Sequence, residues 1–319
     1  MNSLLDALNE CLITPRSTGI TTTELVIKDQ ECGLSFTILE RIEMLAAKQA
    51  ASTGIDALKN PAPEDQTSAQ AVGNLRLVWN RFNILPVHLL LVAITFRHQL
   101  EPLCLDDFHI IHPLLKKCII AFNCGQKSGA SQPRKHLHVI GLPLTRDSSF
   151  PLMDIVNTLQ VLNQPTEVPI FEGRQHCVVR FGPETPNPSL LYSHYCIALN
   201  YCGILFTRQA SSIHDKEEEE EGAHTFRLPP EARNGSIPIE SLMPSETYYA
   251  NQDYSFLLAE GFCFLGVRST GFPLGVGCNS ISYTGNLYSP SKAVSTTIEA
   301  RGMAAILREG LVCKDVHLD

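Results

Sequence analysis

The sequence lacks the marks of several common classes of protein. It has no excess of basic residues: 25 Lys and Arg stand against 33 Asp and Glu, a net charge of -8 at pH 7. A nucleic-acid surface needs a clustered basic excess, so we expect no nucleic-acid partner. The longest apolar run, residues 84–96, is interrupted by Pro86 and His88, and residues 1–13 lack a basic start and a continuous apolar stretch. We therefore expect neither a membrane span nor a secretory signal.

The eleven cysteines lack the CxxC spacing that is typical of redox motifs and of paired metal ligands. Their number is odd, and a chain of 319 residues is too large to need disulfides as staples. These features predict reduced thiols and a cytoplasmic protein. They leave the oligomeric state open.

Hydrophobic residues make up 44% of the chain, which is enough for a buried core in one large domain or two ordinary ones. Helical spacing covers residues 3–12, 41–51, 106–118, 152–162 and 296–307. Strand patterns cover residues 21–27, 34–39, 75–92, 119–123, 134–140, 175–181, 193–199, 203–207, 254–267 and 278–288. This order predicts an α+β fold with a mostly antiparallel sheet and flanking helices, although no internal repeat is visible. The acidic run at residues 214–222 predicts a solvated loop without a function of its own.

Residues 121–140 join a loop rich in small residues to a strand pattern. The loop, residues 123–132, holds two glycines besides Ser128, Ala130 and Ser131, and such a composition lets backbone N–H groups turn toward an anion. It does not end in G-K-[ST], so it is not a Walker loop. Taken alone, the loop would be interpreted as an ordinary turn. The residues that follow it indicate whether it binds a ligand.

The strand pattern after the loop would place Arg134, His136 and His138 on one face, because side chains alternate along a strand. Two imidazoles and a guanidinium would then face whatever the loop holds, which predicts a phosphate site. A His-x-His pair also forms half of some zinc sites, but no Cys or His at ligand spacing clearly completes one. We therefore predict no metal at this position.

Residues 122–138 resemble the active-site signature of the diadenosine tetraphosphate phosphorylases, also called ATP adenylyltransferases, of the histidine-triad superfamily, which are related to galactose-1-phosphate uridylyltransferase. The family pattern F-N-S-G-P-x-S-G-x-S-Q-x-H-K-H-[LI]-Q corresponds to F-N-C-G-Q-K-S-G-A-S-Q-P-R-K-H-L-H here. Further segments similar to family motifs are residues 36–48, 79–92, 203–208 and 279–287. The likeness covers most of the chain, and the acidic region around residues 209–278 is expanded here.

The resemblance implies a histidine-triad-like fold and leaves open two pseudo-equivalent halves. It implies an N-terminal catalytic part, residues 1–165, and a C-terminal adenylyltransferase part, residues 166–319. His136 would be the nucleophile, with His138 beside it in the catalytic site. The implied substrate-binding residues are Lys48, Asn80, Arg81, Phe82, Asn123, Gly125, Ser128, Gly129, Ala130, Ser131, Gln132, Arg134 and Asn279.

A neutral imidazole can attack an α-phosphorus in line and form a nucleotidyl-histidine, which splits one displacement into two easier ones. Phosphate then displaces the nucleotide, so the implied reaction converts diadenosine tetraphosphate and phosphate reversibly into ADP and ATP. The tautomer of the imidazole must be fixed by a bond from its other nitrogen, and donors must be in place for the phosphoryl oxygens. No cofactor is required for this chemistry, and magnesium bound with the nucleotide is left open.

The chain also departs from the family pattern around the nucleophile. Arg134 replaces a histidine, His138 replaces a glutamine, and His194 with Tyr195 stands where a Tyr-Asn pair is expected. Arginine keeps a donor but cannot shuttle a proton. Two alternatives therefore stay open: a nucleotide-binding regulatory protein with weakened catalysis, and a related hydrolase or a transferase that uses another nucleotide.

Overall fold

The computed structural model describes residues 4–15, 22–41, 56, 58–68, 71–144, 150–208, 225–226 and 248–314. Lys48 and the acidic run at residues 214–222 lie outside these residues. The helices are α1 (Leu4–Ile13), α3 (Leu105–Ile111), α4 (Pro151–Thr158), α5 (Pro188–Tyr201), α6 (Lys292–Arg301) and α7 (Met303–Glu309). The strands are β1 (Thr23–Lys28), β2 (Ser35–Glu40), β3 (Leu75–Trp79), β4 (His88–Ala93), β5 (Cys118–Cys124), β6 (His136–Gly141), β7 (Pro165–Thr166), β8 (His176–Arg180), β9 (Phe206–Arg208), β10 (Thr225–Phe226), β11 (Tyr248–Ala250), β12 (Tyr254–Ala259), β13 (Phe262–Val267) and β14 (Asn286–Ser289). Within the described residues, no helix is long and apolar enough to cross a membrane.

The centre of the fold is an eight-stranded sheet in which every neighbouring pair is antiparallel. Its order is β3-β4-β6-β5-β12-β13-β8-β7. Two three-stranded sheets, β1-β2-β14 and β10-β9-β11, lie outside it, and β14 runs parallel to β2. The prediction of an α+β fold with a mostly antiparallel sheet and flanking helices is therefore confirmed.

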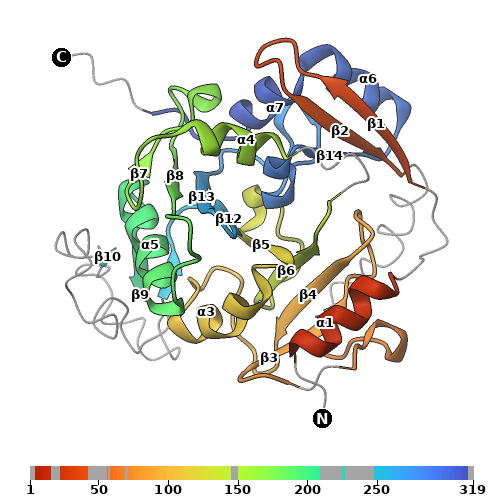
Figure 1. Cartoon of the computed structure of the whole chain (residues 1–319), viewed down its shortest axis with the longest axis vertical. Coiled ribbons are helices and arrows are strands. Elements are labelled where there is room, and N and C mark those ends of the chain that lie inside the picture. Colours follow the sequence, from red (N-terminus) through yellow and green to blue (C-terminus); the bar gives the residue numbers. More distant parts are fainter. Residues whose placement is uncertain are drawn as a thin grey trace, which may run out of the picture.

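Helices cover both faces of the central sheet (Figure 1). One face packs on α1, α3 and α5, and it buries Leu137 and Val139 of β6. The other face packs on α4, α6, α7 and the β1-β2-β14 sheet, and it buries Ile140 of the same strand. Because side chains alternate along a strand, His136 and His138 lie on the second face with Ile140.

The central sheet is built from two halves with the same topology. Each half runs hairpin, helix and two strands: β3, β4, α3, β5, β6 in the first and β7, β8, α5, β12, β13 in the second. The strand orders match, as β3-β4-β6-β5 and β7-β8-β13-β12, and the halves meet where β5 pairs with β12. The two pseudo-equivalent halves are therefore present without a visible sequence repeat. A division into two parts at residue 165 stays a prediction, and the central sheet continues across that position.

The predicted strand at residues 193–199 is wrong, because these residues lie within α5. Asn187 caps this helix by accepting a hydrogen bond from the Leu190 N–H, and Pro188 stands in its first turn. Residues 191–199 are all buried. A helix whose residues are buried on every side lacks the amphipathic period by which a sequence reveals it.

Candidate active site

His136 begins β6 and is held in one tautomer. Its Nδ1 lies 2.8 Å from the carbonyl oxygen of Arg134, and because a carbonyl only accepts, Nδ1 carries the proton. The lone pair is therefore on Nε2. Burial, with 4% of the residue exposed, lowers the pKa of the imidazole, and the bond to the Arg134 carbonyl opposes this shift without cancelling it. The ring is thus neutral and nucleophilic near pH 7.

His138 lies beside His136, and the predicted shared face holds for these two residues. Their ring centroids are 5.4 Å apart. Asn123 fixes the tautomer of His138: its Oδ1 accepts from the N–H of Ser280 at 2.8 Å, so its Nδ2 donates to Nε2 of His138 at 3.0 Å. His138 then carries its proton on Nδ1, which donates to Nε2 of His88 at 2.8 Å.

The same chain of polar groups continues into the bend after β3. Nδ2 of Asn80 lies 2.9 Å from Nε2 of His88, so Asn80 and His138 share the single lone pair of that nitrogen. Oδ1 of Asn80 accepts from the N–H of Phe82 at 3.0 Å. Asn80 thus belongs to the wall of the site and holds the bend that carries Arg81 and Phe82. The chain of hydrogen bonds ties together segments that lie far apart in the sequence.

Three residues of this arrangement were missed in the sequence: His88, Gln99 and Ser280. His88 lies in the family-like segment 79–92, and Ser280 follows the predicted Asn279, so a signal was present for both. Gln99 lies outside every segment of resemblance. Its part is visible only from the hydrogen bonds that it makes with β5 and β6.

Two glycines with positive φ shape the loop between β5 and β6. Gly125 has a φ of 84°, and a Cβ there would lie 2.2 Å from Cγ of Asp253. Gly129 has a φ of 93°, and a Cβ there would lie 2.7 Å from Cβ of Asn279. Neither position therefore tolerates a side chain. The loop packs closely against residues of the second half.

Within the loop, Ser128 and Gln132 have different surroundings. The hydroxyl of Ser128 donates to the carbonyl of Gly125 at 2.6 Å, and the N–H of Ala130 donates to the same oxygen at 3.2 Å, so the loop closes on itself. Oε1 of Gln132 is buried and finds no hydrogen-bond partner among the described residues. Since a buried acceptor without a partner costs free energy, a ligand that brings a donor is favoured there. Ser131 is exposed.

The guanidinium of Arg134 is engaged within the protein, which corrects the expectation that it points at a bound phosphate. It donates to Oδ2 of Asp56 at 2.8 Å and to the carbonyls of Ala93 and Ile94 at 3.0 Å each. Only 3% of the residue is exposed. Arg134 therefore braces the end of β4, while its own carbonyl orients His136.

Replacing Arg134 with alanine should lower the free energy of unfolding by about 1.5–3 kcal/mol, because charged hydrogen bonds are lost and two buried carbonyls lose their donor. Chemical denaturation measures this change. The control is Arg308→Ala, which removes a surface pair with Glu31 and should cost less than about 1 kcal/mol. If Arg134→Ala leaves stability unchanged and raises KM, Arg134 binds the substrate, as the sequence predicts.

The remaining predicted substrate-binding residues have protein partners of their own. Arg81, whose side chain is 51% exposed, donates to Oδ2 of Asp65 at 2.8 Å. Asn279 caps the short 3-10 helix Ser280–Thr284 by accepting from the Ile281 N–H at 2.9 Å. Phe82 is half-buried. Their contacts with a substrate stay predictions.

The departure at residues 194–195 belongs to the core and not to the site. The hydroxyl of Tyr195 lies 2.5 Å from that of Tyr254 and accepts from the Leu103 N–H at 3.1 Å. His194 stacks on Phe181 with ring centroids 5.2 Å apart, and burial lowers its pKa to about 4. These two residues therefore leave the surroundings of His136 unchanged.

The second half repeats the framework without the chemistry. Aligning β4 and β8 on their first residues, His88 and His176, places Phe262 and Phe264 where the first half has its two site histidines. The two-residue turn at 260–261 joins β12 to β13, in place of the long loop between β5 and β6. Among the described residues, the central sheet therefore carries this pair of neighbouring histidines in its first half alone.

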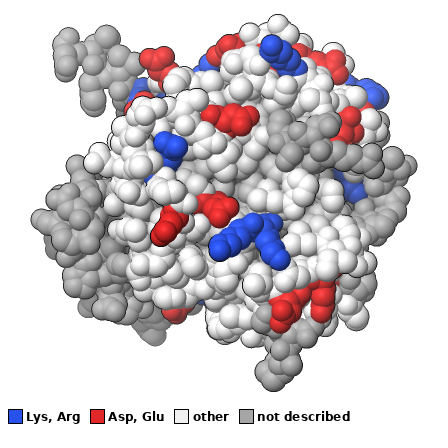
Figure 2. Space-filling view, in the orientation of Figure 1, with Lys and Arg blue, Asp and Glu red and all other residues white. Residues whose placement is uncertain are grey.

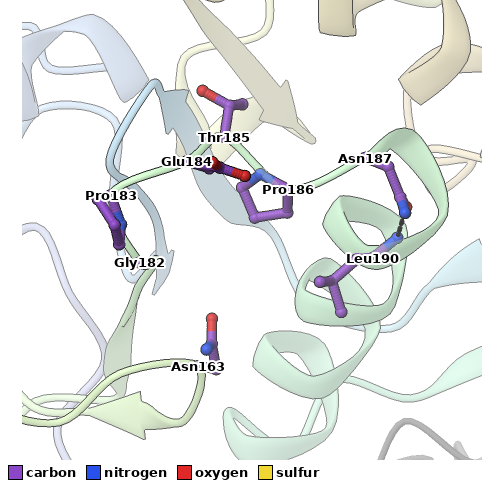
Figure 3. A pocket seen from close by; sticks show the side chains of 8 residues that line it. All are labelled: Asn163, Gly182, Pro183, Glu184, Thr185, Pro186, Asn187 and Leu190. Carbon is purple, nitrogen blue, oxygen red and sulfur yellow. Dashed lines mark hydrogen bonds between the residues drawn. The ribbon is translucent and has the colours of Figure 1, made fainter.

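A surface cavity of 530 Å³ lies in the second half, at the start of α5. Figure 3 shows Asn163 across the cavity from Glu184 and Pro186, with Asn187 bound to the Leu190 N–H beside it. The lining contains no histidine, cysteine or basic side chain. The cavity therefore lacks the groups that nucleophilic or phosphate chemistry needs.

The charged surface residues and the cysteine thiols indicate no further binding site among the described residues. On the face seen in Figure 2, charged side chains of both signs stand in small groups on a mostly uncharged surface. The described part of the chain has no group of three or more His, Cys, Asp and Glu side chains that could hold a metal ion. All eleven cysteines fall within it as free thiols, and Cys313 is the exposed one.

Solved structures share this fold over nearly the whole chain. Yeast Ap4A phosphorylase Apa2 in complex with AMP matches with a TM-score of 0.67 over 99% of both chains, at 16% sequence identity. The same protein in complex with Ap4A matches with a TM-score of 0.65 over 98% of this chain and 99% of that one, at 16% identity. The chain thus shares the fold of these structures, and its site is a pair of buried histidines beside a glycine loop.

The sequence comparisons are more specific. Residues 10–158 match the model of the Ap4A phosphorylase N-terminal domain, which confirms the resemblance found in the sequence. Diadenosine 5',5'''-P1,P4-tetraphosphate phosphorylase 2 of Saccharomyces cerevisiae is 27% identical over 170 residues, which are 48% of this chain and 47% of that protein. Protein APA1 of the same yeast is 31% identical over 77 residues, 21% of this chain and 24% of that protein. In these matches the chain spans about half and about a quarter of the two relatives.

Proposed function

We propose that this protein is a nucleotidyltransferase that phosphorolyses dinucleoside polyphosphates, converting Ap4A and phosphate reversibly into ADP and ATP. The observation that carries the proposal is the neutral, oriented imidazole of His136 beside the glycine loop. The family match of residues 10–158 supports it, as do structural relatives in complex with AMP and Ap4A.

In the proposed mechanism, Nε2 of His136 attacks an α-phosphorus of Ap4A. The bond from that phosphorus to the bridging oxygen breaks, ATP leaves, and AMP stays on the imidazole. Inorganic phosphate then attacks the same phosphorus, the P–N bond breaks, and ADP is released. The Arg134 carbonyl holds the Nδ1 proton of His136 during both steps, so the charge on the ring is stabilised where it develops.

The other residues of the site would bind and orient the substrate. We assign the polyphosphate to the loop of residues 125–132. The unpartnered Oε1 of Gln132 is an acceptor, so it would take a donor from the nucleoside part of the substrate and not from the polyphosphate. His138, held between Asn123 and His88, would keep the wall beside the nucleophile rigid and would transfer no proton in this arrangement. The chemistry requires no cofactor, with magnesium as a companion of the nucleotide.

The test is to incubate the purified protein with Ap4A, with and without phosphate. ADP and ATP that form only with phosphate support the phosphorylase. Products that form equally without phosphate indicate a hydrolase, and binding without products indicates a regulatory nucleotide-binding protein. Either of these last two results overturns the proposal.

The rate at which His136 is nucleotidylated should be flat from about pH 8 down to about pH 6.5, the ordinary value for histidine, and fall only in more acidic solution. Burial lowers the pKa of His136, so the ring stays neutral to a lower pH than a free imidazole does. Single-turnover rates measured against pH in rapid quench would check this. A rate that already falls between pH 8 and 7 contradicts it.

We further propose that the protein acts on nucleotides in the cytoplasm, with the nucleophile in the part before residue 165. Binding of Ap4A, ATP and ADP by the purified protein tests the choice of ligand, and cell fractionation tests the compartment. Mass spectrometry of the trapped nucleotide tests the position of the nucleophile.

A further inference from the structure

The hydrogen-bonded ladder between β5 and β6 stops short of the nucleophile. Its last pair is Ala121 with His138. Two residues further along, the same register would join Asn123 to His136, and this pair does not form. The two strands therefore separate where the two residues of the site begin.

The side chain of Gln99 occupies the gap. Its Nε2 donates to the carbonyl of Asn123 at 2.8 Å and to that of His136 at 3.1 Å, while its Oε1 accepts from the His136 N–H at 2.8 Å. Because the backbone partners have only one possible role each, the orientation of this amide is determined. The side chain of Gln99 thus takes the place of one backbone-to-backbone pair of the sheet. It sets the spacing between Asn123 and His136.

Gln99 is itself held by the backbone next to the nucleophile. It is 2% exposed, and its N–H donates to the Pro133 carbonyl at 2.8 Å. The N–H of Lys135 donates to the Arg97 carbonyl at 2.7 Å, so residues 97–99 run along residues 133–135 as a short antiparallel pair. The amide cannot move without moving the start of β6.

In the second half of the sheet, no side chain is inserted between the equivalent pair of residues. In the matched register, Asn123 and His136 correspond to Ala259 and Phe262, and these two pair directly at the end of the β12–β13 ladder. No side chain lies between them in the ladder. The interposed amide is therefore a feature of the half that carries the nucleophile, and the fold itself does not require it.

We propose that Gln99 is a positioning residue for nucleotidyl transfer: it holds the strands apart so that Nε2 of His136 meets the α-phosphorus while Asn123 holds His138. The proposal rests on the proposed function. The side-chain amide of Gln99 is buried and bonded to backbone groups, so its loss should act on the rate of the chemical step and little on substrate affinity.

The first test compares Gln99→Met with Gln175→Met. Both variants lose a side-chain amide, but Gln175 lies in the second half and donates to Cys202. Single-turnover formation of nucleotidyl-His136 should fall by about 10²-fold in Gln99→Met, the scale of a small misplacement of reacting groups, with the Kd for Ap4A close to wild type. Gln175→Met should keep the wild-type rate.

The second test is Gln99→Glu across pH, which also serves if Gln99→Met does not fold. A neutral carboxyl can donate to one carbonyl and accept from the His136 N–H, whereas the ionised form directs negative charge at two carbonyl oxygens. The rate relative to wild type should therefore be highest in acid and decrease as pH rises. The rates are compared for protein that is folded at each pH, and under that condition a residue that only supports the fold would give a ratio independent of pH.

The outcomes separate the two proposals. If wild type forms nucleotidyl-His136 and Gln99→Met forms it equally fast, or if the Gln99→Glu ratio does not change with pH, the positioning role is overturned and the proposed function stands. If wild type forms no nucleotidyl-histidine, the proposed function falls and the positioning role falls with it.

Discussion

Replacing His136 with asparagine should abolish turnover while Ap4A still binds. The rate should fall on the order of 10⁴-fold or more, as when another nucleophilic enzyme loses its nucleophile. Binding should persist because the ground-state phosphates are assigned to the loop between β5 and β6, whose shape depends on Gly125 and Gly129 and not on the imidazole. Steady-state kinetics and calorimetric titration with Ap4A measure the two effects separately.

His176→Asn is the matched control for this variant. His176 is buried, begins β8, and holds its Nδ1 2.9 Å from the carbonyl of Arg174, as His136 does with Arg134. It should lose stability and keep nucleotidyl transfer. Trapped nucleotide should be found on His136 by mass spectrometry. A label on His138, or an unchanged rate in His136→Asn, would end the proposed covalent mechanism.

Replacing Lys135 with methionine should destabilise the protein by about 3–5 kcal/mol, the usual cost of breaking a buried ion pair from one side. Lys135 is 0% exposed and donates to Oδ2 of Asp107 at 2.8 Å and to the carbonyl of Pro102 at 2.7 Å. Methionine fills the same space but leaves the buried carboxylate with Arg97 at 3.4 Å. Denaturant unfolding at neutral pH measures the loss.

The control for this variant is Lys116→Met, at an exposed position, which should change stability by no more than about 0.5 kcal/mol. Burial alone would raise the pKa of Asp107, but Lys135 and Arg97 hold it below its ordinary value. A lowered carboxyl pKa adds stability that is fully present above the unfolded value of roughly 3.9 and is lost as pH falls through the folded pKa. Equal stability of the Lys135 variant and wild type at pH 7 would show that the pair contributes nothing.

Residues 134–136 show where the alternation of side chains along a strand predicts their direction correctly and where it does not. Alternation correctly separates Lys135, which binds α3 through Asp107, from His136 on the opposite face. It also predicts that Arg134 faces the phosphates, and there it fails. β6 begins only at His136, so Arg134 lies before the regular strand. Its guanidinium donates hydrogen bonds to three oxygen atoms of other segments.

The sequence by itself determined the parts of this protein whose cause is local. The glycines at 125 and 129, the spacing of His136 and His138, and the mostly antiparallel α+β pattern are all readable from neighbouring residues, because turns, alternation and helical periods arise within a few residues. The orientation of His136 is also local, since its partner is the carbonyl two residues before it.

Only the tertiary structure decided which distant residues complete the site. Ser280 orients Asn123 across 157 residues, Asp253 fills the space beside Gly125, and Gln99 replaces a rung of the sheet. The buried helix α5 shows the same limit, because its sequence has no polar face to reveal it. Such contacts form only when strands pair and layers pack. No periodic pattern in the sequence tells which two distant residues will meet. The physical reason is that hydrogen-bond saturation and close packing are conditions on the whole fold, whereas sequence patterns report only the chain's nearest neighbours.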